Sequence, residues 1–385
     1  SYSVYSSAPN NGAANDACGI VTVEYKDVAS GECPVVVTRT WRLTDACGNS
    51  STCNQTISVD DTQAPSISVC PVTRNINGCS TADITGPVYS ATTKVSSYAV
   101  FSNATNQGAA TDACGINAVT YKDVASGTCP IVVTRTWTVS DVCGNSTTCN
   151  QIINVLDVTA PDIEDCAEAR DISGCTTADI TDPPYSAVRT ASTEAVFESS
   201  PNWGNVSDTC GIVTVEYKDV AVGSCPMTVT RTWYFKDACG NESSCNQIIN
   251  VDDNINPTPT CPANITQSNA TGVCGATVTF SGSATDNCSG MPVITYSKNS
   301  GTFFNVGTTN VTMTATDGCG NSATCTFTVT VNDTTKPTVI TKPVTLYLNA
   351  LGTATLLTAN VNNGSYDNCA ITSLTLSKTS FNCSN

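Results

Sequence analysis

Apolar and polar residues alternate with a period of two along most of the chain. Clear examples are residues 119–122 (VTYK), 136–139 (TWTV) and 153–155 (INV). This period is typical of strands with one buried face and one solvated face, and no segment sustains the 3.6-residue period of a helix. We therefore predict an all-β protein in which helix is almost absent.

The pattern is repeated, because a Cys-rich stretch returns every 96 residues. "TRTWRLTDACGNSSTC" at 38–53 is followed by "TRTWTVSDVCGNSTTC" at 134–149 and "TRTWYFKDACGNESSC" at 230–245, and a looser copy ends at 325. Short strands separated by Gly, Pro, Asn and Asp favour tandem immunoglobulin-like β-sandwich modules in an elongated rod, each module stapled by its own disulfides. The predicted modules are 1–60 (truncated at its N-terminal side), 61–157, 158–253, 254–333 (the fourth, shorter unit) and 334–385 (truncated at its C-terminal side).

Composition narrows the class of protein. The 385 residues include 23 cysteines, and this high number predicts an oxidising, extracellular location. The sequence contains no histidine. A net charge of −16 argues against a nucleic-acid partner, since phosphate binding needs clustered Lys and Arg. The chain has no apolar run of 18 residues, so no membrane span is predicted.

The cysteines have three interpretations: disulfides, a metal–thiolate site, or a nucleophile. A catalytic site is rarely needed four times in tandem, and no histidine is available as a base. The sequence therefore favours structural disulfides and a protein that is not an enzyme.

Strand length suggests how the cysteines pair. Cys129 lies at a hairpin turn, and an eight-residue strand spans about 26 Å, whereas bridged Cα atoms lie within about 7 Å. Cys114 should then pair with Cys143 at the open end. The first strand of a sandwich commonly lies parallel to the last, which puts Cys70 beside Cys149 and leaves Cys79 for Cys129.

The same scheme, applied to the whole chain, predicts further pairs. They are Cys18–Cys47, Cys166–Cys245, Cys175–Cys225, Cys210–Cys239, Cys261–Cys325 and Cys288–Cys319. It leaves Cys33, Cys53, Cys274, Cys369 and Cys383 without partners.

The fourth unit resembles a hyalin repeat (HYR) module. It has an opening Cys-Pro at 261–262, "ATDNC" at 284–288, "FNVGTTNVTMTATDGCGN" at 304–321 and "TCTFTVTV" at 324–331. The longer units, with "TRTW" and "DACGN", are similar to Cys-rich repeats of large Bacteroidetes surface proteins, including gliding-motility adhesins, and "DNCAITSLTLSKTSFNCSN" at 367–385 fits another such repeat. The resemblance implies an immunoglobulin-like sandwich, export to the cell surface by type 9 secretion, and a role in adhesion or as a stalk.

Acidic residues gather at the predicted module junctions. Those that could bind calcium between modules are Asp60, Asp61, Asp157, Asp252, Asp253 and Asp333. Calcium takes six to eight oxygen ligands, and a site between modules would stiffen a tandem array. The alternative is that these residues cap turns through their own backbone.

Three other features could carry function. Arg39, Arg135 and Arg231 precede tryptophans by two positions, so each shares a strand face with an indole, for packing or for a ligand. Candidate glycosylation sites are Asn49, Asn103, Asn145, Asn205, Asn241, Asn310 and Thr334, although β propensity alone explains much of the threonine. Trp203, in the loop "SSPNWGN", is the tryptophan outside the strand pattern.

Function classes follow from these features. The leading hypothesis is an adhesive stalk that contacts neighbouring repeats and presents a tip, absent here, to surface glycans or abiotic surfaces. A second is a filament subunit that pairs with other copies of the chain and is glycosylated. A third is a set of carbohydrate-binding accessory modules, for which Trp203 is the aromatic candidate.

Overall fold

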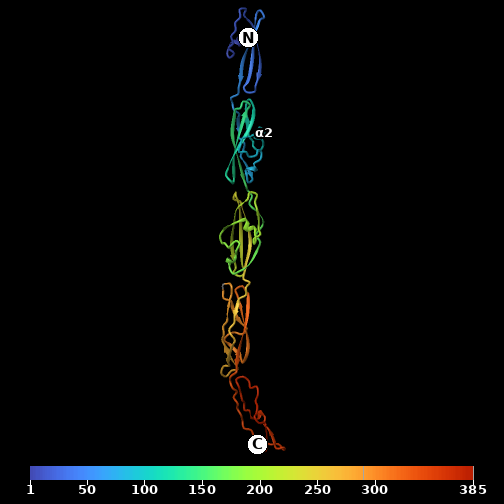
Figure 1. Cartoon of the computed structure of the whole chain (residues 1–385), viewed down its shortest axis with the longest axis vertical. Coiled ribbons are helices and arrows are strands. Elements are labelled where there is room, and N and C mark those ends of the chain that lie inside the picture. Colours follow the sequence, from blue (N-terminus) through green and yellow to red (C-terminus); the bar gives the residue numbers. More distant parts are fainter. Residues whose placement is uncertain (289, 385) are drawn as a thin grey trace. The chain divides into compact units, whose positions relative to one another are not determined.

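Strands dominate this computed structural model, which describes residues 1–288 and 290–384 (Figure 1). The all-β prediction is confirmed, and the helices are single turns: α1 (Tyr2–Ser6), η1 (Thr81–Asp83), α2 (Tyr98–Phe101), η2 (Thr177–Asp179), α3 (Glu194–Glu198) and α4 (Thr358–Val361). None of the helices in the described part of the chain has the length and apolar character needed to cross a membrane. Compact unit 1 comprises residues 1–164, 205–215 and 234–244, and unit 2 comprises the other described residues.

The second module (61–157) contains a five-stranded sheet and a two-stranded sheet. The larger sheet has the order β5-β10-β9-β8-β6, and the smaller one pairs β4 with β7. The strands are β4 (Ser66–Val69), β5 (Arg74–Asn77), β6 (Lys94–Ser96), β7 (Ala109–Thr111), β8 (Ile116–Ser126), β9 (Ile131–Asp141) and β10 (Ser146–Leu156). β5 runs parallel to β10, whereas β8, β9 and β10 pair antiparallel.

Alternation along β9 explains the layers of this module. Val133, Arg135, Trp137 and Val139 are fully buried, and the threonines between them are half-buried. Ala110 of β7 and Ile67 of β4 pack against this face, so the two sheets form a sandwich around one core. The period of two in the sequence thus corresponds to the inner and outer faces of the larger sheet.

The third module (158–253) repeats this arrangement with the sheet order β12-β17-β16-β15-β13. Its strands are β11 (Asp162–Asp165), β12 (Arg170–Ser173), β13 (Thr190–Ser192), β14 (Asn205–Ser207), β15 (Ile212–Val222), β16 (Met227–Asp237) and β17 (Glu242–Asp252). Ile180, Val229, Ile249 and Val251 form a buried apolar cluster within unit 2.

The fourth module (254–333) is a shorter sandwich. The four-stranded sheet has the order β19-β25-β24-β22, and β18 pairs with β21 and β20 with β23. Its strands are β18 (Thr258–Thr260), β19 (Ile265–Ser268), β20 (Gly275–Val278), β21 (Ser283–Thr285), β22 (Val293–Tyr296), β23 (Thr302–Asn305), β24 (Gly307–Thr316) and β25 (Ser322–Asn332). Phe304 of β23 packs against Phe327 of β25 in the core.

The first and last segments contain fewer strands. The first (1–60) has one antiparallel sheet, β1-β2-β3, and the last (334–385) pairs β26 with β27. Their strands are β1 (Ile20–Ser30), β2 (Val35–Asp45), β3 (Ser50–Val59), β26 (Thr353–Thr355) and β27 (Ser380–Asn382).

A buried ion pair lies in the core of the second module. The Arg135 guanidinium, which is completely buried, donates to both carboxylate oxygens of Asp123 at 2.7 and 2.8 Å. It also donates to the carbonyl oxygens of Pro87 and Val88 and lies 4.4 Å from the ring centroid of Tyr121. The arginine is therefore a core residue, which agrees with the packing interpretation of these arginines.

The same pair occurs in the neighbouring modules. Arg231 pairs with Asp219 and is equally buried, whereas Arg39 and Asp27 keep 22% and 34% of their side chains exposed. The aspartate was not predicted from the sequence, although an Asp on the same face of the strand as the buried Val119 and Tyr121 recurs every 96 residues. A buried guanidinium needs such a partner because desolvation of an unpaired charge is costly.

Candidate functional site: the module junctions

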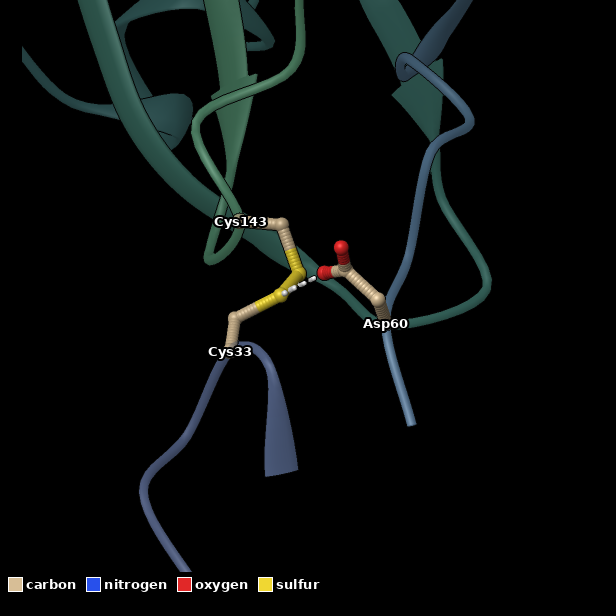
Figure 2. Close-up of side chains that lie close together, drawn as sticks. All are labelled: Cys33, Asp60 and Cys143. Atoms are coloured by element: carbon tan, nitrogen blue, oxygen red, sulfur yellow. Dashed lines mark hydrogen bonds between the residues drawn. A yellow bond between two sulfur atoms is a disulfide. The ribbon is translucent and has the colours of Figure 1, made fainter. Parts of the chain in front are cut away.

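Consecutive modules are joined by disulfides as well as by the backbone linker. The cysteine at the hairpin turn of one module bonds to the cysteine of the Cys-Gly-Asn loop in the next module. These bonds are Cys33–Cys143, Cys129–Cys239 and Cys225–Cys319 (Figure 2 for the first).

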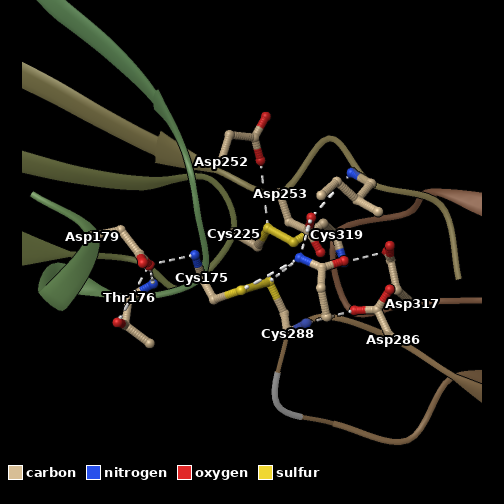
Figure 3. The surroundings of a disulfide bond; sticks show 12 residues. Cys175, Thr176, Asp179, Cys225, Asp252, Asp253, Asp286, Cys288, Asp317 and Cys319 are labelled. Atoms are coloured by element: carbon tan, nitrogen blue, oxygen red, sulfur yellow. Dashed lines mark hydrogen bonds between the residues drawn. A yellow bond between two sulfur atoms is a disulfide. The ribbon is translucent and has the colours of Figure 1, made fainter.

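A second type of bond accompanies these. One partner is a cysteine that follows an early strand of a module or, in the fourth module, precedes β20. The other partner is the cysteine of an Asp-x-Cys segment in the next module. These bonds are Cys79–Cys210, Cys175–Cys288 and Cys274–Cys369. Figure 3 shows the two bonds of one junction, Cys175–Cys288 and Cys225–Cys319, close together.

Disulfides within modules join the two sheets. Cys70–Cys149, Cys166–Cys245 and Cys261–Cys325 are bonded in the structure, and each was among the pairs named from the sequence. In each case, one cysteine lies in the last strand of the module. The other cysteine lies just before the strand that runs parallel to this last strand.

The other pairings named from the sequence are wrong. Cys79 and Cys129 do not bond to each other, and neither do Cys114 and Cys143, Cys175 and Cys225, Cys210 and Cys239, Cys288 and Cys319, or Cys18 and Cys47. Cys33, Cys274 and Cys369, which had been left without partners, are bonded.

The physical reason is that strand length orders the cysteines only within a module. β9 separates Cys129 from Cys143, as the sequence indicated, and each cysteine lies at one end of its module. The linker from Val59 to Ser66 is short, so the end of one module meets the beginning of the next. A cysteine at a module end therefore has one potential partner in its own module and one in the adjacent module. The 96-residue repeat does not show which of the two it bonds.

Five cysteines form no disulfide: Cys18, Cys47, Cys53, Cys114 and Cys383. All five are exposed. A hydrogen bond with the Asp61 carboxylate raises the pKa of the Cys114 thiol. This thiol stays protonated at neutral pH, which argues against a nucleophile there.

The Cys-Gly-Asn loop ties each module to the linker in front of it. Asn145 donates from its side-chain amide to the backbone carbonyl of Asp61 at 2.9 Å and to the carboxylate of Asp141 at 2.8 Å. Gly144 has a φ of +89°, a conformation that favours glycine. Each residue of the motif thus has a role: the cysteine bonds the previous module, the glycine makes the turn, and the asparagine holds the linker.

This arrangement recurs with the same partners. Asn241 donates to the carbonyl of Asp157 at 3.1 Å, and Asn321 to that of Asp253 at 2.7 Å. This role of the asparagines was not predicted from the sequence. Asn145 and Asn241 each follow their linker aspartate by 84 residues, whereas Asn321 follows its linker aspartate by 68 because the fourth module is shorter.

Acidification should weaken these loops. Burial acts to raise the pKa of Asp317, but hydrogen bonds from Asn321, Cys319 and Gly320 outweigh it and hold this pKa below the usual value. Because the folded-state pKa lies below the unfolded value of ~3.9, the stabilisation is present above about pH 4 and is lost as the pH falls through the folded-state pKa. We expect the thermal midpoint of the oxidised chain to fall below pH 4, and to fall less steeply in Asp317→Asn. Equal slopes for both proteins would contradict this account.

The aspartates predicted to bind calcium separate into two groups. Asp60 and Asp252 lie beside disulfides, 3.4 Å from Cys33 Sγ and Cys225 Sγ respectively (Figures 2 and 3). Both sulfurs are in disulfides, so these clusters cannot act as metal thiolates. Asp61, Asp157, Asp253 and Asp333 occupy equivalent linker positions, and one oxygen of each caps a turn.

The candidate glycosylation sites differ in their surroundings. Asn145 and Asn241 are half-buried donors at the junctions, so a glycan on either amide would break the contact with the linker. Asn205 donates to Glu164 at 2.7 Å, and Asn49 to Asp45. The remaining candidates are Asn103, Asn310 and Thr334, and the side chains of Asn310 and Thr334 are exposed.

Trp203 is 58% exposed and has a φ of +53°. Its neighbour Asn202 is fully buried and hydrogen-bonded to Val196 and to Gln247. The loop thus buries the Asn202 side chain and leaves the Trp203 indole exposed to solvent. Trp203 remains the aromatic candidate for carbohydrate binding.

Comparison with known protein families identifies one module. Residues 252–331 match the HYR domain. The chain is 31% identical over 220 residues to hyalin of Strongylocentrotus purpuratus and 31% identical over 216 residues to hyalin of Lytechinus variegatus. Each match covers 53% of this chain, but 17% of the first hyalin and 38% of the second, so the chain spans less than half of either relative.

Solved structures resemble the chain only distantly. The extracellular domains 1–4 of protocadherin gamma B7 match 78% of this chain and 83% of their own length, at 12% identity and a TM-score of 0.28. Immunoglobulin domains 1–5 of sidekick-1 match 77% of this chain and 66% of their own length, at 13% identity and a TM-score of 0.23.

Proposed function

We propose that this chain is an extracellular, adhesive repeat segment that carries mechanical load through covalent bonds between its modules. Its match to the HYR domain and to hyalin supports an adhesive repeat protein, and its nine disulfides support an oxidising location outside the cell. A stalk built from these modules is part of the proposal. The finer proposal, a cell-surface adhesin of bacterial type exported by type 9 secretion, rests on the Cys-rich repeats described above.

The observation that carries this proposal is an unbroken covalent route across the junctions. It runs from Cys33 to Cys143, along β9 to Cys129, across to Cys239, along β16 to Cys225, and across to Cys319. Within the second and the third module, the route follows one strand of eleven residues and the residues that flank it, and the two cysteines are fourteen positions apart. The linkers are not part of it.

This route leaves almost no chain to release under tension. Fourteen residues extend to about 50 Å at most, and as a strand they already span about 46 Å. A 96-residue module without any disulfide, including the one within the module, could extend to roughly 330 Å. Force along the chain therefore acts on covalent bonds before it can unfold the second or third module.

Cutting a linker tests whether load bypasses it. A protease site inserted between Val158 and Thr159 allows cleavage while the oxidised chain is held by its ends at constant force. We expect the tether to survive cleavage without a change in length, and to break on cleavage after reduction.

The matched control removes both bonds at this junction. In Cys79→Ala/Cys129→Ala, the disulfides within modules remain, and cleavage should break the tether even under oxidising conditions. Breakage of the oxidised parent chain on cleavage would show that the junction is not covalently bridged and would refute the proposed function.

A further inference from the structure

Buried carboxylate oxygens without a hydrogen-bond partner recur at the module junctions. They include Asp61 Oδ2, Asp157 Oδ2 and Asp253 Oδ2, which are spaced at 96 residues. The side chains of Asp157 and Asp253 are only 3% and 2% exposed. Leaving an ionised oxygen buried and unpaired costs several kcal/mol, so its repetition requires a physical explanation.

The other oxygen of each carboxylate holds it in place. Oδ1 of Asp253 accepts from the backbone N–H of Ile255 at 3.0 Å and from the Asn287 amide at 3.1 Å. Asp61 and Asp157 accept in the same way from Gln63 and Thr159. The free oxygen therefore has a fixed direction at each junction.

A second carboxylate, from the following module, lies close to the linker aspartate. Asp286, in the Asp-x-Cys segment, accepts from the backbone N–H of Cys288 through Oδ2, and its Oδ1 is buried without a partner. Ligand-type oxygens of Asp253 and Asp286 lie within 4.8 Å of each other, as do those of Asp61 and Asp112. Two carboxylates at this separation repel each other unless a cation lies between them.

Space for such an ion is present beside the pair. A cavity of about 350 Å³ is lined by Asp253, Asp286 and Asp317 and by the two disulfides of the junction. In Figure 3, Asp253, Asp286 and Asp317 lie around the disulfides Cys175–Cys288 and Cys225–Cys319. The cavity has room for the water molecules that would complete an ion's coordination.

The next junction has corresponding groups. Asp367 Oδ1 and Asn368 Oδ1 are buried without partners, and the Asn368 amide donates to Asp333 Oδ1 at 3.4 Å. Asn287 and Asn368 therefore make the same contact with their linker aspartates. Among the described residues, six of the eight buried polar atoms without a partner belong to these junction segments.

We propose that Asp253 and Asp286 together bind a calcium ion, and that Asp61 and Asp112 form the corresponding site at the first junction. The free donors are oxygens, and the sulfurs beside Asp253 and Asp286 are in disulfides, a donor set that suits calcium. With two carboxylates and several waters, the affinity belongs to the weak range of extracellular modules, with Kd of about 10⁻⁴–10⁻³ M. This goes beyond the load-bearing function, which needs only the covalent bonds.

Hydrogen exchange of the full oxidised chain tests the site between the third and fourth modules. In 150 mM sodium chloride, taken as roughly physiological ionic strength, about 5 mM calcium should slow exchange in the linker that follows Asp253, whereas magnesium should have a smaller effect. Asp253→Asn and Asp286→Asn should each raise the calcium concentration needed to slow exchange in this linker by roughly tenfold or more, because each removes a charged ligand.

Asp252→Asn is the matched control. It removes one charge from the adjacent residue, beside the Cys225–Cys319 bond, and should leave the calcium response unchanged. The proposal is overturned if calcium has no effect on the linker, or if Asp252→Asn weakens the response as much as Asp253→Asn, which would indicate general screening. The tethered-chain experiment in the absence of calcium would still decide the load-bearing function.

Discussion

Replacing Arg135 with methionine is expected to destabilise the second module by about 3–5 kcal/mol. The substitution leaves the Asp123 carboxylate, which is 1% exposed, without the guanidinium that neutralises it. It also leaves the carbonyl oxygen of Pro87 without its donor. Hydrogen exchange of β9 in the native state measures the change in the free energy of opening for this module alone.

The first module supplies a matched control. Arg39→Met breaks the same pair where both side chains are partly exposed, so solvent screens the charges and the loss should be much smaller than for Arg135→Met. The double variant Arg135→Met/Asp123→Leu removes both charges and should recover much of the loss. Equal losses for Arg135→Met and Arg39→Met would show that burial of the charge is not what makes the pair important.

Removing the disulfide between Cys166 and Cys245 is expected to destabilise the third module by about 4 kcal/mol in the chain-entropy approximation. The bond joins residues 79 apart, so its loss greatly enlarges the conformational freedom of the unfolded module. The variant Cys166→Ala/Cys245→Ala, with other disulfides intact by mass, should show a lower thermal midpoint and faster hydrogen exchange in β17.

Cys53→Ala is the control for this substitution. Cys53 occupies the position of Cys245 in the first module and is not in a disulfide, so its replacement removes a thiol but no covalent constraint. Its thermal midpoint should match that of the parent chain. A loss in Cys53→Ala as large as that in the double variant would mean that packing of the cysteine, not the bond, stabilises the strand.

The two kinds of disulfide have different mechanical consequences. Cys70–Cys149 and its equivalents restrict the unfolded state of one module, whereas Cys129–Cys239 and its equivalents connect folded modules to each other. A chain that has lost the first kind would unfold more easily but remain continuous. A chain that has lost the second would depend on its linkers for continuity.

Calcium at the junctions would complement these bonds. The disulfides limit how far two modules can separate, but rotation about a few single bonds remains open to them. An ion between Asp253 and Asp286 would join the linker to the following module, which restricts the linker itself. Covalent bonds and calcium would thus oppose different motions at one junction.

The residue pattern predicted most features that lie within one module. Val133, Trp137 and Val139 alternate with polar residues, and they form the buried face of β9 because a strand places every second side chain on the same side. Cys149 was assigned to Cys70 because the first strand of such a sandwich was expected to run parallel to the last. In the structure, the second strand, β5, runs parallel to β10, and Cys70 lies just before β5, so the pairing is correct. Both predictions depended on local geometry with a known period.

Features that depend on two segments at once were harder to predict. Arg135 was placed beside Trp137, but its partner Asp123 lies on the adjacent strand, and only the register of β8 against β9 brings them opposite each other. The junction carboxylates of Asp253 and Asp286 are 33 residues apart and belong to different modules. The sequence indicated that these aspartates were numerous at the junctions, and the structure shows which of them face each other.

The sequence by itself determined the strand class, the 96-residue repeat, the covalent nature of the cysteines and the disulfides that close each sandwich. These follow from the side-chain period and from distances measured along a strand. Only the tertiary structure decided that Cys79 and Cys129 bond forward to the next module instead of to each other. In a tandem repeat, every module end has equivalent cysteines on both sides of a linker. Which two cysteines bond depends on how the folded module ends meet, and the spacing of the cysteines along the sequence does not reveal it.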